Sequence, residues 1–240
     1  MGNREIRISV CLACYNGERY ISEQVSSILS QLGPQDELII SDDGSTDNTL
    51  SEVESIADSR IRIYENTGTH GVNGNFENAL RHAEGEYIFL SDQDDVWLDG
   101  KVDGCLEALS RSCCVVHDAY ITDGNLRTEG TFFQTFNCRA GFVHNWIRNG
   151  YLGCAMAFRK DVLKEVLPIP RDLPVWHDIW IGSICALKYN VEFIPIKGIL
   201  FRRHSDTTSI TSKSSFTLTK KISYRIGVLW HLFKRIVLHT

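Results

Sequence analysis

The sequence predicts an α/β protein with a mainly parallel central sheet flanked by helices. Short apolar runs alternate along the chain with segments whose apolar residues recur at helical spacing, an order typical of crossover connections. Two of these runs end directly in acidic turns. Because ligands bind beyond the carboxyl ends of strands in open α/β sheets, the same observation predicts where the functional site lies.

The first half of the chain, about residues 1–120, is expected to form a nucleotide-binding half with five strands. We predict these strands at residues 6–13, 37–41, 60–64, 86–90 and 112–120. Between them we predict four helices with one apolar face each, formed by Ile21, Val25, Ile28, Leu29 and Leu32; by Leu50, Val53 and Ala57; by Phe76, Ala79, Leu80 and Ala83; and by Val102, Leu106 and Leu109.

The second half, about residues 121–212, is less regular, as expected where an acceptor must be recognised. Residues 150–158 are typical of a loop that enters a buried strand. Residues 176–180 open a helix with an apolar face, and residues 191–200 form a further strand. We expect both halves to belong to one domain over residues 1–212, with a basic amphipathic helix over 213–240.

Length and composition agree with one enzyme domain. The chain has 240 residues, of which 43% are hydrophobic, which is ordinary for a globular protein. No uncharged apolar stretch reaches the roughly 18 residues of a spanning helix. The N-terminus runs into the first strand without an apolar signal region, so we expect a cytoplasmic protein with reduced, mostly buried cysteines.

Three carboxylates follow the predicted strand 86–90 within four positions, from Asp92, Asp94 and Asp95. Charges this close repel one another unless something positive lies among them. They offer only hard oxygen ligands, which suit Mg²⁺ or Mn²⁺ completed by water and substrate phosphates. The alternative is a solvated acidic turn. The position at a strand end favours the metal.

A second acidic turn follows the predicted strand 37–41. Gly44 permits a tight turn there, and Ser45 or Thr46 can cap the next helix. A turn with a cap does not explain the two adjacent carboxylates of Asp42 and Asp43. We therefore expect both of them close to a ligand at the sheet edge.

These turns, together with the segment Ala13–Gly17 after the first strand, resemble family-2 glycosyltransferases of the GT-A fold. Residues 9–16 look like that family's first-strand signature, residues 41–47 like its nucleotide-binding turn, and residues 92–95 like its metal-binding Asp-x-Asp element. The resemblance covers roughly residues 6–205, and its motifs are specific as an ordered set.

The sequences of residues 91–97 and 176–180 most resemble those of bacterial rhamnosyltransferase-like members. The resemblance implies an inverting, metal-dependent transferase using Mg²⁺ or Mn²⁺. It would move a sugar from a UDP- or dTDP-linked donor to a hydroxyl of a glycan or lipid-linked acceptor in cell-surface polysaccharide synthesis. No nucleic-acid partner is expected.

The resemblance also assigns residues to roles. Those expected to bind the nucleotide sugar are Tyr15, Asn16, Asp42, Asp43, Asn75 and Asp92, with Asp43 accepting a hydrogen bond from the pyrimidine N3–H. Those expected at the metal are Asp94, Asp95 and His204. The sequence does not rank Asp94 against Asp95 as the direct ligand. For His204 the alternative is an ordinary surface or core position. Arg202 and Arg203 beside it either meet diphosphate charge or are solvated.

Asp178 is the candidate catalytic base. A carboxylate beside aromatic, poorly hydrated surroundings should have a raised pKa, which suits a base, and the family places its base at this point. The alternative is a first-turn acidic residue favoured by the helix dipole. Many relatives have Glu-Asp where this chain has His177-Asp178, so the role of His177 is open.

The glycine-rich loop over residues 66–75 lacks the lysine and spacing of a P-loop. It is either a surface turn or one wall of the nucleotide pocket, whose backbone N–H groups can approach a phosphate. We expect His70 in this loop to be solvent-exposed rather than a ligand.

The tail differs in charge from the rest of the chain. No acidic residue follows Asp206, whereas six basic residues do. One helical stripe carries Ile222, Ile226, Leu229, Trp230, Phe233 and Val237. Such a helix either lies in an anionic membrane interface on the inner face of the cell membrane or docks on protein.

Two other functions fit the same residues. A metal-dependent nucleotidyltransferase also needs clustered carboxylates and a nucleotide pocket, but it releases pyrophosphate rather than a nucleoside diphosphate. A catalytically silent nucleotide-sugar-binding subunit would keep the pocket without turnover. The intact Asp94, Asp95 and Asp178 favour an enzyme over the silent subunit.

Overall fold

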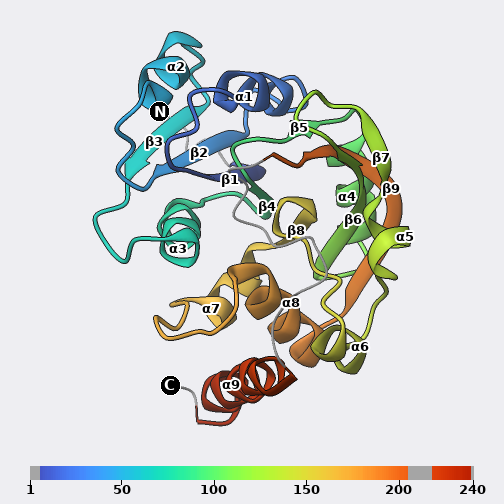
Figure 1. The fold of residues 1–240 in the computed structure, drawn as a ribbon. Helices are drawn as coiled ribbons and strands as arrows, with labels where there is room; N and C mark the ends of the chain where they lie inside the picture. The colour runs from blue at the N-terminus through green and yellow to red at the C-terminus, as the bar shows by residue number, and fades with distance from the viewer. Residues whose placement is uncertain (1–5, 205–217, 239–240) are drawn as a thin grey trace.

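The computed structural model describes residues 6–204 and 218–238, which form an α/β domain and a C-terminal helix (Figure 1). The strands are β1 Ile8–Cys14, β2 Glu37–Asp42, β3 Ile61–Glu65, β4 Tyr87–Ser91, β5 Val96–Trp97, β6 Cys114–Thr122, β7 Thr128–Thr131, β8 Met156–Arg159 and β9 Val191–Arg202. The helices are α1 Ile21–Leu29, α2 Thr49–Ser55, α3 Val72–His82, α4 Lys101–Leu109, α5 Phe132–Phe136, α6 Phe142–Ile147, α7 Leu163–Val166, α8 His177–Lys188 and α9 Leu218–Val237, with short 3₁₀ turns η1 Gly153–Ala155 and η2 Lys160–Val162.

The strands form one sheet in the order β3-β2-β1-β4-β8-β6-β9-β5, and β7 pairs with β6. The first four strands of this order are parallel to one another. Cys14 lies opposite Asp42, and Leu12 lies opposite Ser91. The carboxyl ends of β1, β2 and β4 therefore meet at one edge, as the sequence predicts.

The expected boundary near residue 120 does not divide the sheet. We expected the strand that became β6 to close the nucleotide-binding half. Instead, β8 from the second half lies between β4 and β6 and is antiparallel to both. Its residues Met156, Ala157 and Phe158 are fully buried. Parallel pairing resumes between β6 and β9, whereas β5 is antiparallel to β9.

The core lies between this sheet and its helices. Helix α3 packs on β1 and β2, and α4 packs on β6 and β9. The sheet supplies the largest share of the fully buried residues, among them Val10, Leu12, Ile39, Phe89 and Val115. Each predicted strand and helix is present among the described residues, with shifts at several ends. Residues 213–217 and 239–240 of the helix predicted over 213–240 lie outside the described part of the chain.

Two helices begin elsewhere than predicted. Helix α2 starts at Thr49 with Asn48 as its N-cap residue, so neither Ser45 nor Thr46 caps it. The Asp47 carboxylate accepts the Thr49 N–H at 3.0 Å. Ala57, expected on its apolar face, lies beyond its end with φ 52° and is exposed. Helix α3 starts at Val72, inside the segment expected to be a loop.

Helix α9 packs against α8, at the end of the molecule away from α1 and α2 (Figure 1). Within residues 6–204 and 218–238, no helix has the length and apolar character needed to cross a membrane. All eight cysteines are free thiols, and six of them are buried, as expected for small core residues.

Candidate active site

Three loops meet where β1, β2 and β4 end. The loop after β1 is joined to the acidic turn after β4 by Gln93, whose Oε1 accepts the Tyr15 N–H at 2.8 Å and whose Nε2 donates to the Tyr15 carbonyl at 3.1 Å. It is joined to the turn after β2 by Asn16, whose Oδ1 accepts the Thr46 N–H at 2.8 Å. Asn16 has φ 47°. Tyr15 is 54% exposed, so its ring is accessible to a ligand.

Asp42 shapes the turn after β2. Its Oδ2 accepts the N–H groups of Gly44 and Ser45 at 3.1 and 2.9 Å, and its Oδ1 accepts the Ser45 hydroxyl. The residue is 2% exposed. The structure therefore gives the buried Asp42 carboxylate a role in holding the turn, and its part in the nucleotide pocket stays a prediction.

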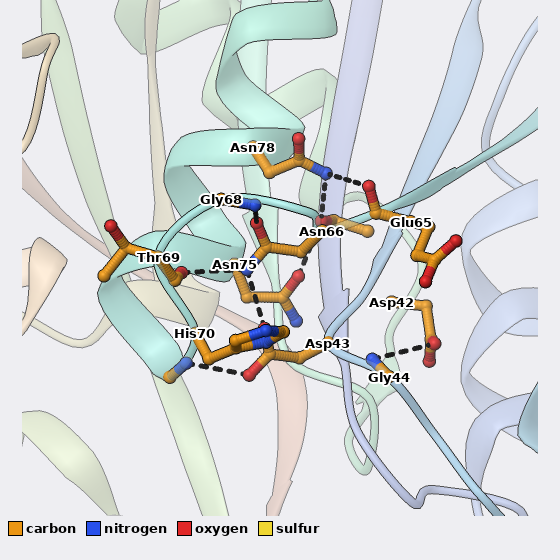
Figure 2. A network of polar contacts seen from close by, with 12 residues as sticks. Asp42, Asp43, Gly44, Glu65, Asn66, Gly68, Thr69, His70, Asn75 and Asn78 are labelled. Atoms are coloured by element: carbon orange, nitrogen blue, oxygen red, sulfur yellow. Dashed lines mark hydrogen bonds and ion pairs between the residues drawn. The ribbon is translucent and has the colours of Figure 1, made fainter.

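Asp43 lies in the turn after β2, and its carboxylate points toward the glycine-rich loop and the N-terminus of α3 (Figure 2). Its carboxylate accepts hydrogen bonds from Asn66 Nδ2 at 2.6 Å and from the Gly71 N–H at 2.8 Å, and it contacts His70 Nδ1 at 3.0 Å. The loop thus orients Asp43. The His70 side chain is 68% exposed, as predicted, and it also pairs with Asp43.

Asn75 is buried and joins strands rather than facing the loops. Its Oδ1 accepts the Ser41 hydroxyl, and its Nδ2 donates to the Cys14 carbonyl at 2.9 Å. Both ends of the amide bind the ends of β1 and β2. The structure therefore gives Asn75 a role in holding the sheet edge together, and its predicted contact with the nucleotide sugar stays a prediction.

Asp94 and His204 come together although they are 110 positions apart. His204 Nε2 lies 2.8 Å from Asp94 Oδ2, and both side chains remain partly exposed. The His204 ring also lies 4.8 Å from the Tyr20 ring. A carboxylate oxygen and an imidazole nitrogen on an accessible surface suit Mn²⁺ or Mg²⁺.

Asp95 is more deeply buried than that pair. It is 1% exposed, and its Oδ1 accepts the Arg202 N–H at 3.1 Å. Its ligand atoms lie within 4.8 Å of those of Asp92 and Cys154. Burial, together with the charges of Asp94 and Asp92, raises the pKa of Asp95 well above its usual range. The three residues predicted at the metal therefore divide into an Asp94–His204 pair and a buried Asp95.

The Asp92, Asp95 and Cys154 cluster suits a divalent cation less well. Burial raises the pKa of the Cys154 thiol well above its usual range, so the soft, protonated sulfur is a poor ligand for a hard cation. No N–H or O–H group in the described part of the chain donates to Asp95 Oδ2. A protonated Asp95 fits these surroundings.

The buried positive charge next to this turn was not predicted from the sequence. Lys101, the first residue of α4, is fully buried; its Nζ donates to the Cys154 carbonyl at 2.8 Å and lies 3.7 Å from the Trp97 ring centre. Burial lowers the pKa of Lys101 to about 8, although the nearby thiols and carboxyls oppose that shift. One signal was available: Lys101 shares its helix face with the apolar positions Cys105 and Ala108.

Arg202 is a second buried cation. Its Nε donates to the Asp94 carbonyl at 2.8 Å, its Nη1 donates to the Gly124 carbonyl at 3.0 Å, and its Nη2 pairs with Glu23. Sequence analysis expected this residue to meet diphosphate or to be solvated. The structure instead uses its guanidinium to fix the acidic turn against α1 and β9.

Asp178 lies in the first turn of α8 and is 7% exposed. Burial raises its pKa to about 6, while the N–H groups of Ile179 and Gly153 oppose the shift. The charge of Asp178 in turn helps to raise the pKa of Asp92 to about 7, after burial and Asp94. Asp178 is therefore close enough to the acidic turn to interact with it electrostatically.

The turn η1 connects these groups. Cys154 lies beside Asp92 and Asp95, and Gly153 packs under α8, where an added Cβ would lie 2.6 Å from His177 Nε2. The His177 ring stacks on Phe76 at 3.7 Å. Neither of its nitrogens has a partner in the described part of the chain, and burial lowers its pKa to about 3. His177 is thus a neutral packing neighbour of Asp178.

Comparison with known proteins bears on this arrangement. Residues 9–167 match the family model described as Glycosyl transferase family 2. The chain is 38% identical over 212 residues to the UDP-Glc:alpha-D-GlcNAc-diphosphoundecaprenol beta-1,3-glucosyltransferase WfgD of Escherichia coli, covering 85% of this chain and 79% of that one. It is also 38% identical over 241 residues to the dTDP-rhamnosyl transferase RfbG of Shigella flexneri, covering 91% and 78%.

Among solved structures, the mannosyltransferase PcManGT of Pyrobaculum calidifontis, in complex with GDP-Man and Mn²⁺, is similar with a TM-score of 0.65. The identity is 20%, and the match covers 97% of this chain and 68% of that one. Fold and site thus define a GT-A-type α/β glycosyltransferase. The chain belongs to glycosyl transferase family 2.

Proposed function

We propose that this protein is an inverting glycosyltransferase that uses a UDP- or dTDP-linked sugar and a divalent cation. The observation that carries the proposal is the position of Asp178, a buried carboxyl whose pKa is raised to about 6 and whose charge reaches the acidic turn. The relatives WfgD, a UDP-Glc-dependent glucosyltransferase by name, and RfbG, a dTDP-rhamnosyl transferase by name, support a UDP- or dTDP-linked donor.

The donor would bind at the edge where β1, β2 and β4 end. Asp43 would accept the pyrimidine N3–H, and the accessible Tyr15 ring would lie along the base. Asn16 and Asp42 would hold the loops that form this pocket, since their polar groups join the turns. Asp92 would contact the ribose, because it opens the acidic turn beside this pocket.

Asp94 and His204 would hold Mg²⁺ or Mn²⁺. Their 2.8 Å contact brings two suitable ligand atoms together, and both side chains are accessible. When bound, the cation would offset negative charge on the leaving diphosphate. Asp95 would support this turn from below rather than bind the ion, because it is buried against Arg202.

Asp178 would take the proton from the acceptor hydroxyl as that oxygen bonds to the anomeric carbon. The bond from the anomeric carbon to the diphosphate oxygen breaks on the opposite side, and the nucleoside diphosphate leaves with the electron pair. One base and one displacement imply inversion. A pKa of about 6 leaves Asp178 ionised and still basic near neutral pH.

The acceptor would be a glycan hydroxyl, on a lipid-linked intermediate of cell-surface polysaccharide synthesis. The name of WfgD states a diphosphoundecaprenol-linked acceptor for that relative. Because such an acceptor remains in the bilayer, we place the enzyme on the cytoplasmic face of the cell membrane as a peripheral protein.

The test is transfer across a panel of UDP-, dTDP- and GDP-sugars with Mn²⁺ or Mg²⁺, comparing the parent with Asp178→Asn. Turnover should fall by about 10²–10⁴, as expected for loss of a positioned base, while UDP affinity stays near that of the parent. Asp161→Asn, which removes an exposed carboxylate, is the matched control.

Three results would contradict the proposal. Release of pyrophosphate instead of a nucleoside diphosphate would indicate a nucleotidyltransferase. Donor binding without transfer to any acceptor would indicate a silent subunit. Transfer by Asp178→Asn at the parent rate would place the base elsewhere.

A further inference from the structure

Helix α9 docks on the domain through one face only. Val228 and Leu232 on that face are each 3% exposed. Trp146 Nε1 of α6 donates to the Arg225 carbonyl at 3.3 Å, and Arg225 Nε donates back to the Trp146 carbonyl at 3.1 Å. Near the other end, Arg235 Nη1 donates to the Leu167 carbonyl at 2.8 Å. The helix is therefore held along its length.

The predicted apolar stripe lies on the side that remains exposed. Its members are Ile222, Ile226, Leu229, Trp230, Phe233 and Val237, and each is between 38% and 60% exposed. The Trp230 and Phe233 rings are stacked, with centres 6.1 Å apart. The sequence left two alternatives for this helix, namely docking on protein or lying in a membrane interface. In the structure one face of the helix docks on the domain, and the apolar stripe on another face stays exposed.

The basic residues around this stripe favour an anionic surface as its partner. Lys234 Nζ lies 5.1 Å from the Trp230 ring centre, and Lys220 Nζ lies 5.8 Å from the Tyr224 ring centre. No acidic residue follows Asp206, although the whole chain has a formal charge of −5. A second copy of α9 laid symmetrically on the first would bring basic residues together, whereas an anionic bilayer would attract them.

We propose that the stripe of α9 seats the enzyme on an anionic lipid bilayer in a fixed orientation. Trp230 and Phe233 would enter the level of the headgroups, and Lys220 and Lys234 would meet lipid phosphates. The docked face would keep the catalytic domain at a set angle to the surface. This inference rests on the proposed function for its purpose, since a lipid-linked acceptor must be reached there.

A groove of about 410 Å³ supports the orientation. Its walls are Tyr224 of α9, the segment around Arg171 and Trp176, and the glycine-rich loop at Gly71. Trp176 directly precedes His177 and Asp178. The groove therefore connects the bilayer-facing helix with the start of the helix that carries the candidate base.

The test is partitioning of the full chain onto phosphatidylcholine vesicles with and without phosphatidylglycerol. Binding should require phosphatidylglycerol and weaken with added salt. Joint replacement Ile226→Ser, Trp230→Ser and Phe233→Ser should lower the partition coefficient at least about tenfold. Ile63→Ser on β3, which also removes an exposed apolar side chain, should leave it unchanged. Brominated lipid should quench the parent fluorescence and quench Trp230→Phe less.

Other readings of the stripe give different results. If the parent ignores phosphatidylglycerol vesicles, or if the triple variant binds them like the parent, the inference is wrong. If the triple variant instead changes the mass in light scattering, the stripe contacts a second copy. Failure of the proposed function is distinguishable: Asp178→Asn should bind vesicles like the parent, and the triple variant should bind UDP like the parent.

Discussion

At the scale of single residues, burial decides the chemistry of the candidate site. Asp178 and His177 are neighbours in the first turn of α8, yet burial raises the pKa of the carboxyl to about 6 and lowers that of the imidazole to about 3. In both cases the charged form is disfavoured. Of these two neighbours, only Asp178 therefore titrates in a range useful to a base near neutral pH.

This difference predicts the pH dependence of transfer and of stability. The rate should rise as pH increases through about 6, because the basic form of Asp178 then appears. The folded pKa lies above the usual 3.8, so the folded state binds the proton more tightly and stability falls as pH rises from about 4 through 6. Asp178→Asn should remove this cost and unfold with a free energy higher by up to about 3 kcal/mol at pH 7.

Urea unfolding at pH 3.5 to 8 (roughly the span of the two pKa values) measures the effect. The curves of the parent and Asp178→Asn should converge below about pH 4. A constant difference across the whole range would show that the carboxyl is not titrating with a raised pKa.

Lys101 gives a second prediction at this scale. Lys101→Met removes the donor to the Cys154 carbonyl and a buried cation whose charge interacts with Asp95 and Asp92. We expect the free energy of unfolding to fall by about 2 kcal/mol or more. Lys160→Met is the control, because the exposed Lys160 amine also donates to a carbonyl, that of Glu84, at 2.8 Å. Equal losses in both variants would contradict a special role for the buried amine.

At the scale of elements, the short turn η1 has more influence than its length suggests. Cys154 contacts the acidic turn after β4, and Gly153 supports the start of α8. Two candidate functional groups from distant segments are thus positioned by adjacent residues. A change in η1 should alter the geometry of the site without removing any ligand-binding side chain.

Gly153→Ala tests this role. The added Cβ would lie 2.6 Å from His177 Nε2 and 3.6 Å from Asp178 Cβ, so the His177 ring or the backbone at the start of α8 must shift. We expect turnover to fall by about 10- to 100-fold, with UDP affinity close to that of the parent. Gly130→Ala, whose Cβ would meet nothing closer than 3.8 Å, is the control. Loss of UDP binding in step with turnover would indicate general disruption instead.

At the scale of the whole molecule, one sheet joins the two halves of the site. The nucleotide-binding loops follow parallel strands, whereas β8 crosses between β4 and β6 in the opposite direction. His204 reaches Asp94 because β9 runs beside β6 and also pairs with β5, which directly follows the acidic turn. Donor and metal are therefore expected to bind as linked ligands at one edge.

Calorimetry can measure this linkage. Mn²⁺ should bind the parent weakly alone and about 5- to 150-fold more tightly with UDP, with the same factor for UDP in the presence of Mn²⁺. His204→Ala should weaken Mn²⁺ binding, whereas His144→Ala on α6 should not. Full transfer activity in excess chelator would rule the metal out.

The sequence by itself determined most of the strands and helices, the two acidic turns and the family. Those features are local, since they depend on the alternation of apolar segments and on motifs a few residues long. Asp42, Asp43 and Asp92 were correctly placed at strand ends because parallel strands share one edge. Helical spacing alone also predicted the apolar stripe of α9.

Only the tertiary structure decided which of these residues act together. In the structure, Asp95 is buried while Asp94 pairs with His204, and the Asn75 amide binds the ends of β1 and β2. Lys101 and Arg202 are buried next to the acidic turn. The tertiary structure also turned the α9 stripe outward while another face docked. Such contacts join residues tens to more than one hundred positions apart. Which of these groups meet, and how far burial shifts their pKa values, therefore follows from packing between distant segments.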